Sequence, residues 1–506
     1  MKAKYLIYLL LLLLLASCSG GPAENLSQNG EVTVAPTPTT LPAGPTPTPL
    51  PDRPTYMPGE LVEYTAQTGD TLLALAARFN TTVEEIQAAN PGIPMNASTM
   101  PPGMPIQIPI YYRTFWGTPF KMIPDSQFIN GPAAVDFDTA TFTGGTNGWI
   151  NHYQEYAMSE ERSGPELINL VARNYSISPR LLLALSEYFA NALSYPALPE
   201  QSADYPFGYI NPLSRGYYRQ LLWAANQLNQ GYYSYREGKL LEIELADGTI
   251  ERPDPWQNAA TVSLQRMFSL IMTAPQYQQA IGPEGFAKTW EALYGDPWEN
   301  DEPHIPGSLT QPGLILPYAA GESWAYTGGP HTAWGDGEPA AAIDFAPASD
   351  ITGCYVSNDW TIAMADGLIA RTDPGIVMLD LDKDGDERTG WVLFYLHVAN
   401  RDQIAEGTEV SAGDPLGHPS CEGGNATGTH VHLARKYNGE WIIADSPVPF
   451  VMEGWRAVAG DRLYEGSLVR FEKTVTASEF STAETILTAT GNVDGHVVDV
   501  TPSPEP

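Results

Sequence analysis

The chain has 506 residues, and 59 acidic against 26 basic side chains give it a formal net charge of −33. This length is enough for two or three domains with linkers between them. So acidic a surface repels phosphate groups, which argues against nucleic acid as a partner.

The first residues have the pattern of an export signal. Lys2 and Lys4 precede an apolar run from Leu6 to Leu15, which is too short to span a membrane. The Leu-Ala-Ser-Cys sequence that ends at Cys18 resembles the signal of bacterial lipoproteins, and this resemblance implies a lipidated Cys18. We therefore expect residues 1–18 to direct export of the protein. A lipid anchor should then hold the protein on the extracytoplasmic side of the cell membrane. An ordinary signal peptide with a chance cysteine is the alternative.

Residues 19–60 are rich in proline and threonine, as in the stretch Pro45-Thr46-Pro47-Thr48-Pro49. This composition cannot build a hydrophobic core and favours an extended, semi-rigid chain. The segment is therefore predicted to be a linker that separates folded domains from the anchor.

Residues 61–110 have the pattern of a small βααβ module. A strand is expected at Val62-Glu63-Tyr64-Thr65, and Thr82 with Glu85 forms a capping-box signal for the second of two helices. The sequences Thr68-Gly69-Asp70-Thr71-Leu72 and Ala89-Asn90-Pro91 resemble the LysM module. That resemblance implies binding of glycans that contain N-acetylglucosamine, such as peptidoglycan. A spacer without glycan affinity is the alternative.

Residues 120–300 are mainly helical by pattern. Ser163-Gly164-Pro165-Glu166 and Ser178-Pro179 predict helix starts. Residues 176–185 resemble the helix that opens lysozyme-like lytic transglycosylases, which implies a lysozyme-like domain. The position of the catalytic acid in that family is occupied by Phe189, and Glu187 lies about 200° away around the helix axis. We therefore expect this domain to be inactive, and Glu187 to be a solvated helix carboxylate.

The strongest motifs come late in the chain. His430 and His432 are two positions apart in a strand-like run, so both side chains can enter one site. His331 lies thirteen positions before Asp344, and His397 ends the run Phe394-Tyr395-Leu396-His397. Two imidazoles and one carboxylate suit Zn²⁺ with a fourth position left for water. There is no His-Glu-x-x-His motif, so the general base is not the glutamate of that metalloprotease class.

These motifs, in this order over residues 305–455, resemble the beta-lytic branch of the lysostaphin-type zinc endopeptidases. The resemblance implies an antiparallel β peptidase domain with its site in a groove. It implies that His331, Asp344 and His432 bind zinc, and that His397 and His430 assist a zinc-activated water. The substrate it implies is the peptide cross-links of peptidoglycan. A structural zinc site or an inactive homologue is the alternative.

Two further groups of residues lie in the same region. Cys354 and Cys421 could form a disulfide in an exported protein, but the sequence leaves their pairing open. Asp380, Asp382 and Asp384 imitate the start of a calcium loop, although the glutamate expected at its twelfth position is replaced by Trp391. A Ca²⁺ site and a solvated acidic turn both remain open.

The sequence thus predicts a multidomain α+β fold: a LysM module, a lysozyme-like helical domain, and an antiparallel β peptidase domain. Residues 456–506 are expected to add one strand and a disordered tail. The predicted function is a membrane-anchored zinc endopeptidase that acts on peptidoglycan. The alternative is a non-catalytic scaffold that holds peptidoglycan or activates another hydrolase.

Overall fold

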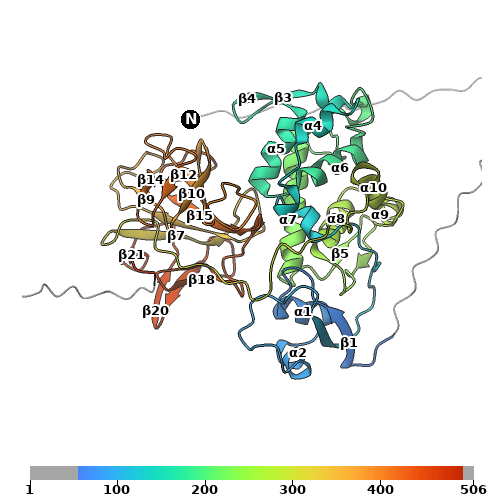
Figure 1. Cartoon of the computed structure of the whole chain (residues 1–506), viewed down its shortest axis with the longest axis horizontal. Helices are drawn as coiled ribbons and strands as arrows, with labels where there is room; N and C mark the ends of the chain where they lie inside the picture. Colours follow the sequence, from blue (N-terminus) through green and yellow to red (C-terminus); the bar gives the residue numbers. More distant parts are fainter. Residues whose placement is uncertain (1–54, 494–506) are drawn as a thin grey trace, which may run out of the picture. The chain divides into compact units, whose positions relative to one another are not determined.

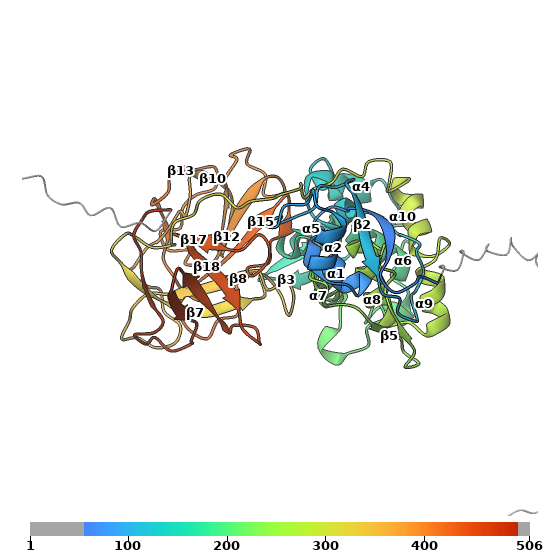
Figure 2. The ribbon, with the colours of Figure 1, turned by 90° about the horizontal axis from the view of Figure 1, so that it is seen from below.

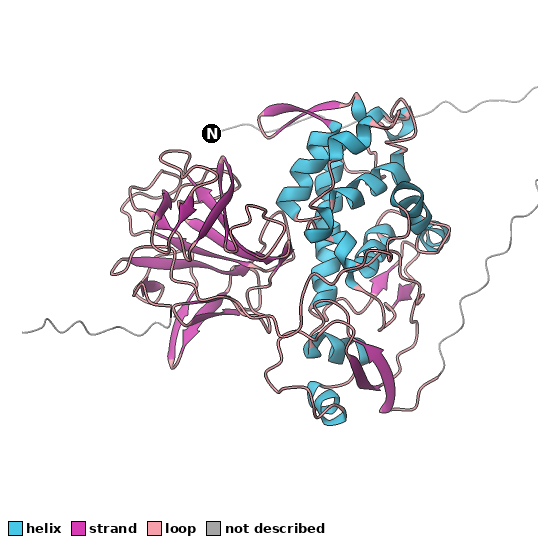
Figure 3. Ribbon diagram, viewed as in Figure 1, coloured by secondary structure: helices cyan, strands magenta, loops and turns pink. Residues whose placement is uncertain are grey.

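The computed structural model describes residues 55–493, and the lipidation site predicted at Cys18 lies outside them. The described chain forms a βααβ module, a helical region and a region of β-strands (Figures 1 and 3). All sheets are antiparallel, and the predicted multidomain α+β fold is confirmed. Within residues 55–493, no helix has the length and apolar character needed to cross a membrane.

The βααβ module folds as its sequence pattern predicts. The hydroxyl of Thr82 accepts a hydrogen bond from the Glu85 amide at 3.2 Å, and the Glu85 carboxylate accepts one from the Thr82 amide at 3.3 Å. The predicted capping box is therefore confirmed. The two strands pair across the full module, with Glu60 opposite Ile110. The elements are β1 (Glu60–Thr65), α1 (Leu72–Phe79), α2 (Val83–Ala89) and β2 (Pro105–Ile110).

The helical region also begins its helices where the capping signals predict. Ser163 and Glu166 form a capping box at the start of α5, and Pro179 occupies the first turn of α6. The helices are α3 (Asp125–Phe128), α4 (Thr139–Gly144), α5 (Gly164–Tyr175), α6 (Pro179–Ala190), α7 (Tyr217–Arg236), α8 (Ala259–Ser269), α9 (Ala274–Ala280) and α10 (Phe286–Tyr294). Two short hairpins accompany them: β3 (Gln154–Ala157) with β4 (Glu160–Ser163), and β5 (Ile243–Glu244) with β6 (Ile250–Glu251).

One large sheet organises the C-terminal region, in the order β13-β10-β11-β12-β15-β8-β7-β21, with β16 paired to β15. Its strands β7, β8, β12 and β15 carry the predicted site residues His331, Asp344, His397 and His432. They are β7 (Ser323–His331), β8 (Ala342–Ala346), β10 (Gly367–Asp373), β11 (Gly375–Asp380), β12 (Trp391–Val398), β13 (Glu409–Val410), β15 (Val431–Tyr437), β16 (Glu440–Trp441) and β21 (Ile486–Thr488). A small separate sheet joins β9 (Thr361–Ile362) to β14 (Pro415–Gly417).

A second sheet packs on the first. It has the order β17-β18-β19-β20, and its strands β18 and β19 lie against β7 (Figure 2). The strands are β17 (Val451–Met452), β18 (Trp455–Ala459), β19 (Gly466–Arg470) and β20 (Lys473–Thr476). Because β21 then returns to pair with β7, the β-region extends past residue 455, the end predicted for it.

A buried ionic cluster connects the three regions. The Arg236 guanidinium at the end of α7 lies 3.2 Å from the carboxylates of both Asp125 and Glu440, and donates to the Thr68 carbonyl. His304 Nε2 lies 2.6 Å from the same Glu440 carboxylate. Buried charges are tolerated only when paired in this way.

Glu237, directly after α7, should make the stability of the protein depend on pH. Its burial, and then the nearby Glu338 carboxylate, raise the pKa of Glu237 to about 7. The folded protein therefore keeps a proton that the unfolded chain releases near pH 4.5, so stability falls as the pH rises towards 7. In wild type this proton should change the free energy of unfolding by up to about 3 kcal/mol between low and neutral pH, and we expect Glu237→Gln to remove that change. Urea unfolding at about pH 5 and pH 8 measures the pH dependence of stability. The control Glu244→Gln, at an exposed position, should behave as wild type. An unchanged pH dependence in Glu237→Gln would contradict the expectation.

Candidate active site

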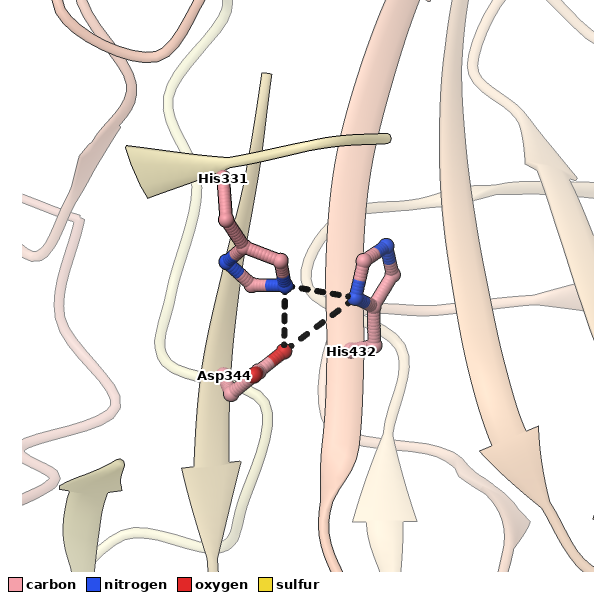
Figure 4. A group of neighbouring side chains, drawn as sticks. All are labelled: His331, Asp344 and His432. Atoms are coloured by element: carbon pink, nitrogen blue, oxygen red, sulfur yellow. Dashed lines mark hydrogen bonds and ion pairs between the residues drawn. The ribbon is translucent and has the colours of Figure 1, made fainter. Parts of the chain in front are cut away.

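Three neighbouring strands bring together the residues predicted to bind metal. His331 ends β7, Asp344 lies in β8, and His432 in β15 stands directly opposite Asp344 in the sheet register. His331 Nε2 and His432 Nδ1 are 3.0 Å apart, and each lies 3.2 Å from Asp344 Oδ1 (Figure 4). The side chains are almost fully buried, which suits a site that excludes bulk water.

The tautomers of both imidazoles follow from their other hydrogen bonds. His331 Nδ1 lies 2.8 Å from the Gly329 carbonyl, and His432 Nε2 lies 3.1 Å from the Ala333 carbonyl. A carbonyl can only accept, so these two nitrogens carry the protons, and His331 Nε2 and His432 Nδ1 present lone pairs. Burial lowers the pKa of His432, which keeps this ring neutral.

The lone pairs therefore face one another and a carboxylate oxygen. Asp344 Oδ1 is buried and accepts no hydrogen bond from the described residues. Burial would raise the pKa of Asp344, but the imidazoles of His331 and His430 beside it hold that pKa well below its usual range, so the carboxylate is ionised. Three converging acceptors repel unless a cation lies among them, and their chemistry fits a metal ion.

A glycine makes room for this carboxylate. Gly328 of β7 stands opposite Asp344 in the register, and a Cβ atom built on it would lie 2.5 Å from Asp344 Oδ2. Any larger residue at position 328 would therefore displace Asp344. This requirement could not be found from the histidine motifs, because it depends on the pairing of β7 with β8.

The two histidines predicted to assist catalysis lie beside the same group. His430 Nε2 is 3.7 Å from Asp344 Oδ2, and the rings of His397 and His430 are 4.6 Å apart. Both rings use Nδ1 towards a carbonyl, that of Glu422 for His397 and that of Gly428 for His430, which leaves each Nε2 free. Burial, and then the His430 ring, lower the pKa of His397 to about 3, so it is neutral at pH 7.

His397 has a strained backbone. Its φ of 67° lies in the left-handed region, at the end of β12 where the pairing with β11 shifts register. The hydroxyl of Ser420 donates to its carbonyl at 2.9 Å, and the Ser420 amide at 2.7 Å. Strain of this kind in a non-glycine residue is common at functional sites, and here it sets the direction of the imidazole.

One site residue was not predicted. Tyr464, in the turn between β18 and β19, stacks on His331 with ring centres 4.0 Å apart and planes 21° apart. The Gly329 amide donates to the Tyr464 carbonyl at 2.8 Å, which holds the turn against β7. No motif marks Tyr464, because it reaches the site only through the second sheet.

The cysteine pairing that the sequence left open is settled by the structure. Cys354 and Cys421 form a disulfide, with Cα atoms 5.7 Å apart. It ties the loop after β8 to the segment that leads into His430. The disulfide therefore supports the loops around the site without contributing a metal ligand.

The acidic turn has a structural use. Ligand oxygens of Asp380, Asp382 and Asp384 lie within 4.8 Å of one another. However, both oxygens of Asp380 already accept backbone hydrogen bonds, from Asp382 at 3.1 Å and Gly385 at 2.8 Å. Calcium binding there stays a prediction.

Glu187 has a structural role as well. Its carboxylate accepts hydrogen bonds from the backbone amides of Leu193 at 2.7 Å and Ser194 at 3.2 Å, beyond the end of α6. The expected solvated carboxylate is thus a half-buried cap for the following turn. The lysozyme-like character of the helical domain stays a prediction.

Comparison with known proteins places these regions in families. The LysM domain profile matches residues 64–109, and the profile of the LasA N-terminal domain matches residues 121–307. Protease LasA of Pseudomonas aeruginosa is 27% identical over 336 residues, which is 63% of this chain and 74% of the relative.

Two further likenesses concern the β-region. Beta-lytic metalloendopeptidase of Achromobacter lyticus is 28% identical over 31% of this chain and 41% of its own length. Among solved structures, the M23 metalloprotease pseudoalterin from the deep sea matches at 25% identity, 34% of this chain and 96% of its own, with a TM-score of 0.29. That score adds no weight to the sequence relationships. The chain is therefore a metalloendopeptidase related to LasA and to the beta-lytic enzymes, and it carries a LysM domain.

Proposed function

We propose that this protein is a zinc endopeptidase that hydrolyses the peptide cross-links of bacterial peptidoglycan. The observation that carries the proposal is the convergence of three unprotonated ligand atoms, from His331, Asp344 and His432, at 3.0–3.2 Å from one another. Two imidazoles and one carboxylate, with a position left open, are the donor set of catalytic zinc sites. Bound Zn²⁺ supplies Lewis acidity and a water nucleophile at neutral pH.

His397 and His430 complete the proposed machinery. Each has a free Nε2 beside the metal ligands, fixed by an Nδ1 hydrogen bond to a carbonyl. A neutral imidazole whose Nδ1 donates to a carbonyl has a lone pair on Nε2 and can take a proton from the attacking water, whereas a ring protonated at both nitrogens can donate from Nε2 to the oxyanion that forms at the scissile carbonyl. His397 presents the unprotonated Nε2 that the first task needs. His430 lies nearer to Asp344 and suits the second.

The LysM domain is proposed to hold the glycan strands while the β-region cleaves the peptides. An extracytoplasmic position on the membrane, with a lipid on Cys18, is proposed from the signal-like sequence at residues 1–18. The disulfide between Cys354 and Cys421 supports export, since such bonds persist in oxidising compartments.

Replacement of His430 by alanine tests this mechanism. We expect cleavage of purified peptidoglycan to fall by about 10²–10⁴-fold, the usual contribution of a general acid or base. Binding to the insoluble wall should be unchanged, because the LysM domain does not include this residue. New amino termini, identified by mass spectrometry with and without a zinc chelator, report the cleavage.

His152→Ala, which removes an exposed histidine of the helical region, is the matched control and should cleave as wild type. Unchanged cleavage by His430→Ala would refute the assigned role. A wild-type protein that binds the wall but releases no new amino termini would favour the scaffold alternative.

A further inference from the structure

The loop between the first two metal-site residues has an unusual shape. Residues 332–339, which we call the strap, lie in the connection from β7 to β8, between His331 and Asp344. Two glycines, Gly335 and Gly337, have φ values of 83° and 84°. The strap is closed at its base by the Ala333 amide, which donates to the Pro339 carbonyl at 3.0 Å, and by the Thr332 hydroxyl, which donates to the Gly337 carbonyl.

Helix α7 of the helical region holds the tip of the strap. The side-chain oxygen of Asn226 accepts a hydrogen bond from the Asp336 amide at 2.9 Å. One helical turn further on, the side-chain oxygen of Gln230 accepts one from the Glu338 amide at 3.2 Å. Two backbone donors of the strap are therefore satisfied by another region of the protein.

Both glycines are needed for this approach. A Cβ atom on Gly335 would lie 2.3 Å from the side-chain oxygen of Asn226 and 2.6 Å from the Tyr175 ring. A Cβ atom on Gly337 would lie 2.3 Å from the side-chain oxygen of Gln230. The strap thus combines a backbone conformation that favours glycine with a surface that leaves no space for side chains.

The other end of the strap contacts a proposed metal ligand. The Ala333 carbonyl is the acceptor for His432 Nε2, at 3.1 Å. This hydrogen bond puts the proton on Nε2 and turns the lone pair of Nδ1 towards Asp344 and His331. A continuous set of contacts therefore runs from α7, through the strap, to the ring of His432.

We propose that α7 positions the metal ligand His432 through the strap, and that Asn226 and Gln230 are positioning residues for the metal site. The inference rests on the proposed function, since it takes zinc to bind at His331, Asp344 and His432. Mutation of a group that hydrogen-bonds to a ligating histidine commonly weakens metal binding by 10–100-fold. Asn226 and Gln230 contact the strap and not His432 itself, so their loss should have a smaller effect. Loss of both amide oxygens should therefore weaken Zn²⁺ binding by about 3–10-fold.

The test compares the full chain with its Asn226→Ala/Gln230→Ala variant. Zn²⁺ affinity is measured by competition with a chromophoric chelator, and the absorption spectrum of the Co²⁺-substituted protein reports the ligand geometry. We expect weaker Zn²⁺ binding and an altered Co²⁺ spectrum in the double variant. Gln227→Ala is the matched control, because Gln227 lies on the same helix but accepts from Arg266 at 2.9 Å. Asn226→Asp keeps an acceptor for the strap amide and should keep wild-type affinity.

A folded double variant with the Zn²⁺ affinity and Co²⁺ spectrum of wild type would overturn the inference and leave the zinc site intact. A wild-type protein that binds no Zn²⁺ would overturn the proposed function, and the inference with it. If circular dichroism shows that the double variant does not fold, the single variant Gln230→Ala provides the same test. It removes only the hydrogen bond from the Glu338 amide.

Discussion

Asp344→Asn is expected to abolish peptide cleavage and release the metal while the chain stays folded. Asp344 Oδ1 lies 3.2 Å from each of the two imidazole lone pairs, and Asp344 supplies the only negative charge among the three ligands. An amide of the same shape has no charge, and its N–H would donate to one of those lone pairs and occupy it. Removing a member of a catalytic unit commonly lowers the rate by on the order of 10³-fold or more.

Metal content after dialysis, measured by atomic spectroscopy, and release of new amino termini from peptidoglycan both report this result. Exposed Asp350→Asn is the control for loss of one carboxylate and should keep metal and activity. Binding of the Asp344→Asn variant to the wall should match wild type. Full metal content together with wild-type cleavage in Asp344→Asn would show that the three residues are not the metal site.

Local patterns predicted much of this site. The two-residue spacing of His430 and His432 put both rings on one side of a strand, and the structure brings both to Asp344. The capping boxes at Thr82 and Ser163 predicted the starts of α2 and α5, because a cap needs only residues three positions apart. Signals of this kind are complete within a few residues, so a single sequence carries them.

Features that depend on distant residues were not predictable in the same way. Gly328 is required by the pairing of β7 with β8, and Tyr464 reaches His331 only because the second sheet packs on the first. The strap shows the same limit, since its partners Asn226 and Gln230 precede it by 110 and 108 residues. No periodicity links such positions, and only the folded chain shows which glycine or amide serves the site.

Glu440→Gln is expected to be among the most destabilising conservative changes in the protein. The Glu440 carboxylate lies 2.6 Å from His304 Nε2 and 3.2 Å from the Arg236 guanidinium, and accepts from the Tyr232 hydroxyl at 2.8 Å. Burial would raise the pKa of Glu440, but the charge of Arg236 and the hydrogen bond from His304 lower it to about 2. Breaking a buried pair leaves an uncompensated charge, which commonly costs 3–5 kcal/mol, so we expect a loss of about 3 kcal/mol at neutral pH.

The pH dependence of this loss has a definite sign. A carboxyl group with a lowered folded-state pKa contributes stability that is present above about pH 4.5 and is lost as the pH falls towards 2. The difference between wild type and Glu440→Gln in urea unfolding should therefore shrink over that range. Glu465→Gln breaks an exposed pair with Arg462, so it should cost much less stability than Glu440→Gln. An equal cost for the two variants would contradict the prediction.

A double-mutant cycle with Arg236→Met separates the pair from its surroundings. If the cost of Glu440→Gln comes from the buried guanidinium left behind, removing Arg236 as well should restore part of the stability. Asp125 is the second carboxylate on Arg236, at 3.2 Å, so the recovery should be incomplete. Because the Arg236 guanidinium also donates to the Thr68 carbonyl, the double variant should in addition loosen the LysM domain, which hydrogen exchange at α1 would detect.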